Sequence, residues 1–555
     1  MKQIFHTGIF ILSALIFTHC GKSSSPSPQP TPTPTPSSFT MKSWSVDGWT
    51  YDIASRTPEV KLNFSTAIDK SSVASNISFK QNSGTLVPYD VVYSNADNTL
   101  AIKPTAALAP LTRYRITVSK GLKSASGGNL NAATEITFMT TIDSSDKFSQ
   151  ISDSALVELV QKQSFKYFWD FGHPVSGLAR ERNTSGDIVT SGGSGFGIMA
   201  ILTGIHRGFI TRTQGLERLQ TMVSFLKNTA KKVHGAFPHW LNGATGAIVP
   251  FSPKDDGADL VETSYLMQGL LCARQYFNSS ETNETALRAD INTLWNGVDW
   301  NWFRRNNENI LYWHYSENYT WDMNMPIRGW NECLITYVLA ASSPTHSIPK
   351  IVYDEGWAQN GGMKNGKSYY GYVLPLGPEK GGPLFFSHYS FLGINPNNLT
   401  DAYADYHTQV VNHTKINYEY CKSNPNGYYG YSDQCWGLTA SDIQNGYTAS
   451  SPTNDVGVIA PTAALSSFPY TPTESMKALR FFYYKLGDKL WGPYGFYDAF
   501  SLKDAWFANS YLSIDQGPII VMIENYRTGL LWNLFTSCPE VKSGMKNLGF
   551  AAPYL

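Results

Sequence analysis

The order of hydrophobic and polar residues changes once along the chain, near residue 150. Before that point, apolar and polar residues alternate in short runs such as EVKLNFSTAI, LAIKP and YRITVSKG, with Gly, Asn, Asp and Pro between the runs. A period of two residues is that of a β-strand with one buried face. Residues 41–143 are therefore predicted to form a small all-β sandwich.

From Ser152 onward, apolar residues recur every three to four positions, as on one face of an α-helix. We expect an all-α domain over residues 150–555 whose helices close into a double ring, although the periodicity alone also allows an open helical array. In a closed ring, loops from distant parts of the chain meet at one end and can form a site. The helical runs lie near residues 195–208, 213–230, 259–277, 285–297, 329–341, 473–486 and 516–534.

The first twenty residues, MKQIFHTGIFILSALIFTHC, contain one lysine and then an apolar run over residues 8–17. This run is too short to span a membrane and fits the hydrophobic region of a signal peptide. Cys20 follows it, which predicts a lipoprotein that is cleaved before Cys20 and acylated there; the alternative is plain secretion with a cysteine at this position by chance. Residues 21–40 are rich in Ser, Pro and Thr and are expected to form an extended tether. We therefore expect an exported lipoprotein at the periplasmic face or surface of the outer membrane.

The charge and aromatic content narrow the classes of partner. Lys and Arg together number 43, as do Asp and Glu, so the chain lacks the basic field that nucleic-acid binding needs. Aromatic residues make up 14% of the chain, almost as much as the charged residues at 15%. Trp and Tyr have flat apolar faces with a polar edge, which suits sugar rings. The composition therefore favours either a carbohydrate-binding protein or simply a large aromatic core.

Five cysteines follow Cys20, so at least one thiol must be free. Cys421 and Cys435 flank a loop, and an exported protein permits a disulfide there. Cys272 and Cys333 lie in apolar helical runs and are predicted to be buried thiols. The sequence has no CxxC and no HExxH motif, so we expect neither a metal site nor another cofactor.

Four carboxylates fall within eight positions of the segment SPKDDGADLVETSYLMQGLL, at Asp255, Asp256, Asp259 and Glu262. Asp259 and Glu262 have the spacing of a capping box, so Asp259 is expected to cap the helix that follows. A glycine after Asp256 places the first two acids on a loop. Several carboxylates at one helix N-terminus suit the helix dipole but repel one another. We therefore interpret the loop acids and Glu262 as candidates for chemistry.

A second candidate is Glu332, which follows Trp330 and Asn331 and precedes the apolar run CLITYVLAA. A carboxylate that leads a buried helix is costly unless it is paired or hydrogen-bonded. Burial would raise its pKa, as a general acid near neutral pH requires. The structural alternative is a glutamate that the helix dipole stabilises.

Three loops combine aromatic, amide and charged side chains in a pattern typical of sugar binding: YFWDFGHPVSGLARER, AFPHWLNGATGAI and GYSDQCWGLTASD. An exposed Trp can stack on a pyranose ring while nearby polar groups bond its hydroxyls. The candidate substrate-binding residues, in these loops and beside the candidate acids, are Asp170, Arg182, His239, Trp240, Asp256, Trp330, Asn331 and Trp436.

From about Asp153 to its end the chain resembles the bacterial glucoamylase-like domain of glycoside hydrolase family 144. The motifs that carry the resemblance run in order: YFWDFGHPVSGLARER, SGGSGFGIMAI, FPHWLNGATG, DLVETSYLMQGLL, GWNECLITYVLAASSPTH, WGLTASD, VIAPTAALSSFPYTPTESMKALR and IDQGPIIVMIENYRTGLLW. Residues 41–143 resemble bacterial Ig-like domains through VKLNFSTAIDKSSV, NTLAIKP and YRITVSKGLKSASGGNL.

The family resemblance implies an (α/α)6 barrel and an inverting hydrolase of β-1,2-glucan that needs no metal. Members cleave the polymer internally or release sophorose from oligosaccharide ends. The essential acids carry over to Asp255, Glu262 and Glu332, with Asp256 as the alternative to its neighbour.

Inversion requires one acid to protonate the leaving oxygen and one base to activate water, with the two carboxyl groups about 6.5–9.5 Å apart. We expect Glu332 to be the acid, and Asp255 and Glu262 to hold or deprotonate the water in a monomeric enzyme. Two alternatives remain. A non-catalytic glycan-binding lipoprotein would release no reducing sugar. A polysaccharide lyase on the same toroid would need a basic cleft, which the zero net charge disfavours.

Overall fold

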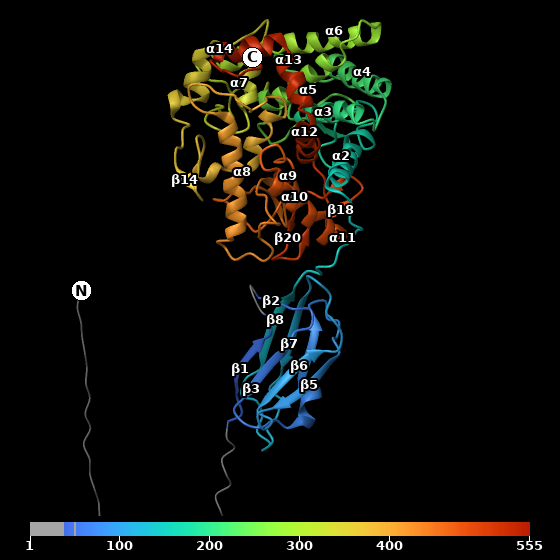
Figure 1. Ribbon diagram of the computed structural model, residues 1–555, viewed down its shortest axis with the longest axis vertical. Coiled ribbons are helices and arrows are strands. Elements are labelled where there is room, and N and C mark those ends of the chain that lie inside the picture. Colours follow the sequence, from blue (N-terminus) through green and yellow to red (C-terminus); the bar gives the residue numbers. More distant parts are fainter. Residues whose placement is uncertain (1–37, 49–51) are drawn as a thin grey trace, which may run out of the picture. The chain divides into compact units, whose positions relative to one another are not determined.

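The computed structural model describes residues 38–48 and 52–555. The predicted signal peptide, Cys20 and most of the predicted tether lie outside the described residues. Within those residues, none of the helices has both the length and the apolar character that a membrane span requires. The described chain contains an N-terminal β domain and a larger, mainly helical domain (Figure 1).

Two four-stranded sheets form the N-terminal domain, with strand orders β1-β3-β6-β5 and β2-β8-β7-β4. In β3, Val60, Leu62 and Phe64 are buried while Lys61 is exposed, which is the alternation that the sequence predicts. The strands are β1 (Met41–Val46), β2 (Ile53–Ala54), β3 (Val60–Phe64), β4 (Ile77–Gln81), β5 (Tyr89–Ser94), β6 (Thr99–Pro104), β7 (Arg113–Val118) and β8 (Thr134–Thr140), with one helical turn, α1 (Val73–Asn76).

The second domain is mainly helical, as predicted, but one long helix was not predicted. That helix is α8 (Tyr406–Ser423), and polar residues interrupt the apolar pattern of its sequence on every turn. The predicted run 516–534 divides at Gly529, whose φ of 71° ends one helix and begins the next. The other helices are α2 (Asp153–Trp169), α3 (Ser191–His206), α4 (Arg212–Asn228), α5 (Leu260–Tyr276), α6 (Thr282–Gly297), α7 (Leu334–Ser342), α9 (Pro461–Leu465), α10 (Pro472–Arg480), α11 (Gly487–Leu490), α12 (Ser513–Thr528), α13 (Leu530–Ser537) and α14 (Pro539–Leu548).

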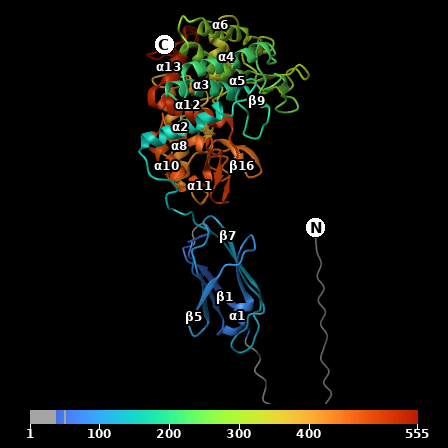
Figure 2. The same ribbon diagram turned by 90° about the vertical axis from the view of Figure 1, so that its right-hand side faces the viewer.

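Helices α3, α5 and α12 form the centre of this domain. Nearly all residues of α3 are buried, and it packs against α5 and α12, with α2 alongside (Figure 2). Gly195 of α3 and Gly269 of α5 make this contact possible. A Cβ on Gly195 would lie 2.1 Å from the Tyr265 carbonyl oxygen, and one on Gly269 would lie 2.2 Å from the Gly195 carbonyl oxygen. The two backbones therefore approach as closely as only glycine allows.

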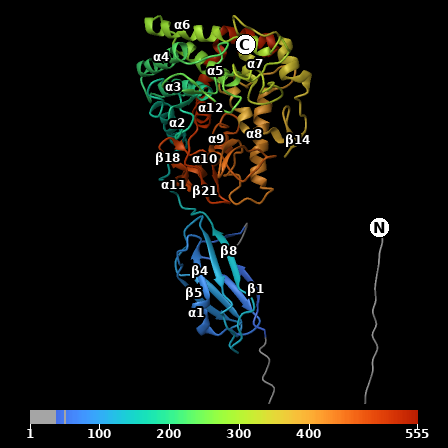
Figure 3. The same cartoon turned by 180° about the vertical axis from the view of Figure 1, so that it is seen from behind.

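Other helices have one face in the core and one in water. Helices α4 and α6 lie side by side (Figure 3). In α4 the buried residues include Leu219, Met222 and Leu226, at the three- and four-residue steps that the sequence shows. Thr211 and Gln214 form a reciprocal capping box at its start.

Short strands lead into the central helices and position the site. Strand β9 (Ile188–Thr190) runs directly into α3 and pairs with β10 (Trp240–Asn242), which pairs with β11 (Ile248–Val249). Strand β12 (Ala258–Asp259) runs directly into α5 and pairs with β13 (His314–Tyr315). The remaining hairpins are β14 (Ser368–Tyr369) with β15 (Tyr372–Val373), β16 (Ala440–Ile443) with β17 (Gly446–Ala449), β18 (Trp491–Gly492) with β19 (Gly495–Phe496), and β20 (Phe500–Ser501) with β21 (Trp506–Phe507).

The five cysteines after Cys20 are all buried free thiols, so Cys272 and Cys333 are as predicted. The disulfide that we considered between Cys421 and Cys435 is not formed. Both thiols belong to an apolar cluster with residues such as Trp436, where each packs as a small hydrophobic side chain.

Candidate active site

A cavity of about 410 Å³ opens beside the N-terminal ends of α3, α5 and α12. Two of the three predicted catalytic carboxylates, Glu262 and Glu332, line it from segments that are seventy positions apart in the chain. Its other polar lining residues are Glu181, Arg182, Thr190, His239 and Ser513, and its aromatic lining residues are Trp240, Phe251, Tyr265, Trp313, Phe385, Tyr389 and Tyr447.

Glu262 lies in the first turn of α5 and is 6% exposed. Its Oε2 accepts hydrogen bonds from the backbone amide of Gly192 at 2.7 Å and from the Thr190 hydroxyl at 3.0 Å. Its Oε1 lies 4.0 Å from Nε2 of His239. Burial raises the pKa of Glu262 despite the opposing charge of His239, and the Asp259 charge adds to the rise. The N-terminal end of α3 therefore fixes one oxygen of this carboxylate, and the other lies on the side of His239.

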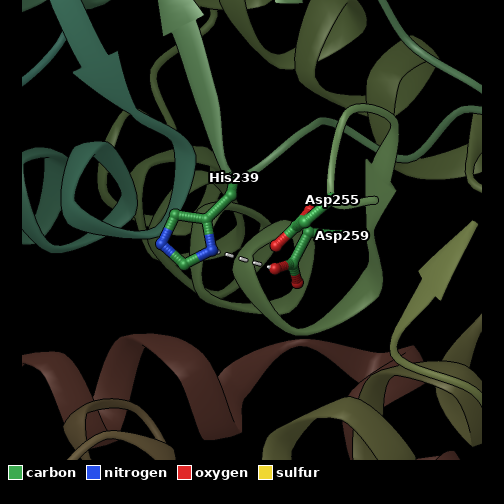
Figure 4. Close-up of side chains that lie close together, drawn as sticks. All are labelled: His239, Asp255 and Asp259. Carbon is green, nitrogen blue, oxygen red and sulfur yellow. Dashed lines mark hydrogen bonds and ion pairs between the residues drawn. The ribbon is translucent and has the colours of Figure 1, made fainter. Parts of the chain in front are cut away.

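Asp259 is fully buried and connects the start of α5 to His239 (Figure 4). Its Oδ1 accepts the backbone amides of Val261 at 2.9 Å and Glu262 at 2.8 Å, which confirms the predicted helix cap. Its Oδ2 lies 3.1 Å from Nδ1 of His239 and accepts Nε1–H of Trp313 at 3.1 Å. Glu262 does not complete the predicted box, because its carboxylate is bonded to α3 instead.

Histidines offset the charge of the acids around Asp259. Burial alone would raise the pKa of Asp259, but His314 and His239 keep it below its usual value. Burial alone would lower the pKa of His239, but Glu262, Asp259 and Asp255 outweigh it and raise the pKa to about 9. His239 is therefore an imidazolium at neutral pH.

Asp255 and Asp256 have different surroundings. Asp255 is 4% exposed, and its Oδ1 lies 3.2 Å from Nδ1 of His314, beside Asp259 and His239 (Figure 4). Asp256 accepts a hydrogen bond from the Asn318 side chain at 2.7 Å. Neither side chain lines the cavity. Asp255 therefore belongs to the charge cluster behind the cavity wall, and Asp256 belongs to a loop–loop contact.

Glu332 lies on the turn before α7 and not within a helix, since α7 begins at Leu334. Its backbone carbonyl accepts a hydrogen bond from the Ser390 hydroxyl, which fixes the turn. Burial raises the pKa of Glu332 to about 7, and the negative charges of Asp259 and Glu262 contribute to the rise. A carboxyl group that is half protonated near neutral pH can donate a proton to an ether oxygen.

His239, Asp255 and Asp259 offer donor atoms that all lie within 4.8 Å of one another, a set that could hold a metal ion. Positive charge is already present there, because the His239 imidazolium has a pKa of about 9. A metal would require neutral His239 and would compete with the bonds that Asp259 receives from His239 and Trp313. The contacts among the described residues therefore pair the Asp259 and Asp255 carboxylates with His239 and His314.

Arg182 joins this cavity to a second, neighbouring cavity of about 640 Å³. Its Nε donates to Glu181 at 2.9 Å, and its Nη1 donates to Asp442 at 3.2 Å. Asp442 also accepts a bond from the Ser510 hydroxyl at 2.6 Å. Tyr447 lines both cavities and is 49% exposed. The two cavities therefore share Arg182 and Tyr447 as lining residues.

The structure places only some of the predicted sugar-binding residues at the cavity. Arg182, His239 and Trp240 line it, whereas Asp170, Asp256 and Asn331 do not. Asp170 caps the C-terminal end of α2, and Asn331 accepts the backbone amide of Cys333 at 2.9 Å.

Two of the tryptophans predicted to bind substrate, Trp330 and Trp436, are buried and do not line the cavity. Trp436 is fully buried, and its Nε1–H donates to the Glu474 carbonyl at 3.1 Å. Trp330 is 4% exposed and packs against Phe391 and Tyr406. Their neighbours in the sequence are polar, but contacts from distant segments bury the rings.

Several cavity residues were not predicted. Glu181 is adjacent to Arg182 in the motif ARER and could have been selected with it. Trp313 lines the cavity, and the next residue, His314, contacts Asp255 behind it. Both lie in the segment ILYWHY, which has the residue types of a β-strand. Tyr265 and Tyr389 carry no local signal, because each lies in an apolar run that looks like core.

Both domains match models of known protein families. Residues 324–539 match the family model described as "Putative glucoamylase", and residues 38–140 match the model of a bacterial Ig-like domain. A curated relative, the exo β-1,2-glucooligosaccharide sophorohydrolase (non-reducing end) of Parabacteroides distasonis, is 47% identical over 421 residues. The match covers 72% of this chain and 58% of the relative, so this chain spans less than two thirds of that protein.

Two solved structures are similar over long stretches. The endo-β-1,2-glucanase of Chitinophaga pinensis, solved with sophorotriose and glucose, is 54% identical with a TM-score of 0.72, over 73% of this chain and all of that one. The β-1,2-glucanase of Parabacteroides distasonis is 38% identical with a TM-score of 0.70, over 91% of this chain and 74% of that one.

Proposed function

The chain belongs to glycoside hydrolase family 144, and on this premise we propose that it hydrolyses β-1,2-linked glucan or its oligosaccharides with inversion at the anomeric carbon. The observation that carries the proposal is the placement of Glu262 and Glu332 on one cavity in different environments. Glu332 has a pKa of about 7, raised mainly by burial, while Glu262 is held by two hydrogen bonds and faces an imidazolium. Glycoside hydrolysis requires two carboxyl groups with separate roles, and inversion is what the family resemblance implies.

In this proposal Glu332 is the general acid. Its carboxyl group is protonated in a large fraction of molecules at neutral pH and lines the cavity. It gives its proton to the glycosidic oxygen as that bond breaks, so the sugar leaves as a neutral alcohol.

Glu262 handles the water on the other side of the sugar. Oε2 is occupied by the Gly192 amide and the Thr190 hydroxyl, which leaves Oε1 to accept a proton. The His239 imidazolium, 4.0 Å away, favours the ionised form. Asp255 acts through this cluster and not on the water itself, because it is buried against His314.

Aromatic side chains are proposed to orient the glucan. Trp240 and Phe251 are in edge-to-face contact at 5.0 Å, and Phe251 stacks on His239 at 4.2 Å while remaining 50% exposed. A partly exposed aromatic pair beside the catalytic carboxylates offers an apolar face to a pyranose. Arg182 supplies hydrogen-bond donors at the junction with the second cavity.

The experiment that tests the proposal is chromatography of the products formed from long β-1,2-glucan, with NMR of the newly formed anomer. A ladder of products indicates endo action, and sophorose alone indicates exo action. Release of the inverted anomer supports the mechanism, and release of the retained anomer contradicts it. Absence of new reducing ends would favour a glycan-binding protein, and an unsaturated product would indicate a lyase.

Glu332→Gln tests the assignment of the acid. We expect kcat on β-1,2-glucan to fall by about 10²–10⁴-fold. A substrate whose leaving group needs no proton should restore much of the rate. Full activity of the variant on β-1,2-glucan would contradict the role of Glu332.

The proposal also covers the architecture of the helical domain and the location of the protein. We propose that the central and outer helices form an (α/α)6 toroid, with the Ig-like domain as a spacer. We further propose a monomer that is a lipoprotein acylated on Cys20 at the outer membrane; the apolar run followed by Cys20 supports the lipid anchor. Labelling with a palmitate analogue tests this, with Cys20→Ser as the variant that should lose the label.

A further inference from the structure

Another cavity, of about 490 Å³, shares no lining residue with the two cavities described above. It lies on the segment between α6 and β13 and on the loop that follows β13. One wall is aromatic, and the rim carries amide and hydroxyl groups. Its volume is in the range of small-molecule sites in proteins.

The aromatic wall consists of Trp302, Tyr315 and Trp321. Their ring centroids lie 4.5 to 5.0 Å apart, and all three side chains are partly exposed. His234 stacks on Trp302 at 3.6 Å, which fixes the orientation of that ring. Three partly exposed rings in one cavity present apolar surface to solvent, which is typical of a binding surface.

The rim offers hydrogen-bonding groups without protein partners. Among the described residues, none is hydrogen-bonded to the side-chain amides of Asn306 and Asn307 or to the hydroxyl of Thr320. Arg305, Asn306 and Asn307 have φ values of 42°, 62° and 63°, three successive residues in the left-handed region. That backbone is unfavourable for arginine in particular, and such strain is concentrated at functional sites.

The charged side chains that line this cavity, Arg305 and Asp299, have partners within the protein. Arg305 donates to Glu308 at 2.9 Å, and Asp299 lies 3.3 Å from Nδ1 of His346. Among the described residues, the rim groups that remain for a ligand are neutral amides and a hydroxyl. Aromatic rings with free amides suit a neutral ligand that has apolar faces and hydroxyl edges.

This cavity is connected to the catalytic cluster through β13. Successive side chains of a strand lie on opposite faces. His314 contacts Asp255, and Tyr315 lines the cavity. The loop after β13 also contacts the Asp255 loop, through Lys254 with Asp322 at 2.5 Å and Asn318 with Asp256 at 2.7 Å.

We propose that this cavity is a second, non-catalytic binding site for the neutral β-1,2-linked glucan, with Trp321 and Trp302 stacking on glucose units and Asn306 and Asn307 bonding their hydroxyls. The inference rests on the proposed function for the identity of the sugar. The site holds a distant part of a long glucan molecule, or a second glucan molecule, and so raises the local concentration of polymer at the enzyme.

Trp321→Ala and Asn307→Ala test the site, with Tyr370→Ala as the matched control. Tyr370 is 42% exposed on a different hairpin and lies outside all of these cavities. Mobility in gels that contain β-1,2-glucan is measured in a Glu332→Gln background, so that the polymer is not degraded. We expect Trp321→Ala to weaken retardation about fivefold to tenfold, Asn307→Ala to weaken it less, and Tyr370→Ala to leave it unchanged.

In the active enzyme, the ratio of kcat/KM on long glucan to kcat/KM on a four-unit oligosaccharide should fall about threefold to tenfold for Trp321→Ala. An unchanged ratio together with unchanged retardation would overturn the second site while leaving the proposed hydrolysis intact. An equal loss on both substrates would also overturn it, since the substitution would then have disturbed the loop that carries Asp255. A wild-type protein that neither binds nor cleaves β-1,2-glucan would instead overturn the proposed function, and this site with it.

Discussion

The Asp259 carboxylate lies 3.1 Å from Nδ1 of His239, while its other oxygen accepts the backbone amides that begin α5. One buried side chain therefore sets both the position of Glu262 and the charge of the histidine beside it. Helix capping and active-site electrostatics depend on the same carboxylate.

Asp259→Asn should uncouple these two roles. The amide keeps an oxygen for the cap but loses the charge that stabilises His239 and His314. Removing one partner of a buried ion pair costs about 3–5 kcal/mol, and we expect the lower end of this range in urea unfolding near pH 6. The exposed cap of α8, Asp405, which accepts the Thr408 amide at 2.7 Å, serves as the control. Asp405→Asn should cost about 1 kcal/mol or less.

The pH dependence of that cost follows from the directions of the two pKa shifts. The pKa of Asp259 is lowered on folding, so its contribution is present above the unfolded value of about 3.9 and is lost toward acid. The pKa of His239 is raised to about 9, so its contribution is complete below the unfolded value of about 6.5 and is lost as pH rises through 9. The effect of Asp259→Asn should therefore be largest between about pH 4 and 6.5. A cost that does not vary with pH would contradict the ion pair.

Glu332→Gln should stabilise the protein at alkaline pH. The folded pKa of about 7 exceeds the usual value of 4.5, so ionising this carboxyl group opposes folding as pH rises from 4.5 to 7. The variant should gain up to about 3 kcal/mol at pH 8 and nothing at pH 4, measured by urea unfolding. Wild-type kcat should fall as pH rises above 7, where the acid loses its proton.

Glu284→Gln is the control, and we expect it to change the free energy of unfolding in the opposite direction. Glu284 is buried, and Arg212 lowers its pKa through bonds at 2.8 and 3.0 Å. Its ionised form stabilises the fold above its unfolded pKa, so the variant should lose stability at pH 8. If both variants changed stability in the same direction at pH 8, burial of Glu332 would not be the cause of its shift.

His239→Gln should move the acidic limb of the pH–rate profile. The positive charge of His239 lowers the pKa of Glu262, and the base must be ionised to work. Removing that charge should raise the pKa of Glu262, so the acidic limb of kcat should shift to higher pH. Lower kcat with an unmoved limb would instead mean that His239 only positions groups.

The sequence could predict the features that depend on local pattern. Alternation identified the strands of the β domain, and the spacing from Asp259 to Glu262 identified the cap of α5. Both features are determined by a few adjacent residues. The local pattern made Glu262 and Glu332 candidates, and the family resemblance named them as essential acids together with Asp255. The fold brings Glu262 and Glu332 to one cavity, which Asp255 does not line.

Tertiary contacts determine the features of the site that the sequence could not predict. Glu262 has the spacing of a capping box, yet its carboxylate bonds to Gly192, seventy positions earlier. Trp436 lies in a polar loop, yet distant segments bury it completely. Asp255 and Asp256 are equivalent by sequence, and only the position of β13 places His314 against the first and the loop after β13 against the second.

Gly192→Ala should lower kcat through steric displacement of Glu262. A Cβ at this position would lie 2.5 Å from Oε2 of Glu262 and 2.8 Å from Cδ2 of Tyr265, both closer than real contacts allow. The carboxylate must therefore move away from the amide that fixes it. We expect kcat on β-1,2-glucan to fall at least tenfold and stability to fall by about 1–3 kcal/mol from overpacking. Gly297→Ala is the control, because a Cβ there meets no atom within 4 Å. That variant, at the end of α6, should keep full activity and should gain up to about 1 kcal/mol in urea unfolding. If Gly192→Ala retained wild-type kcat, catalysis would not require Glu262 to be held at the start of α3.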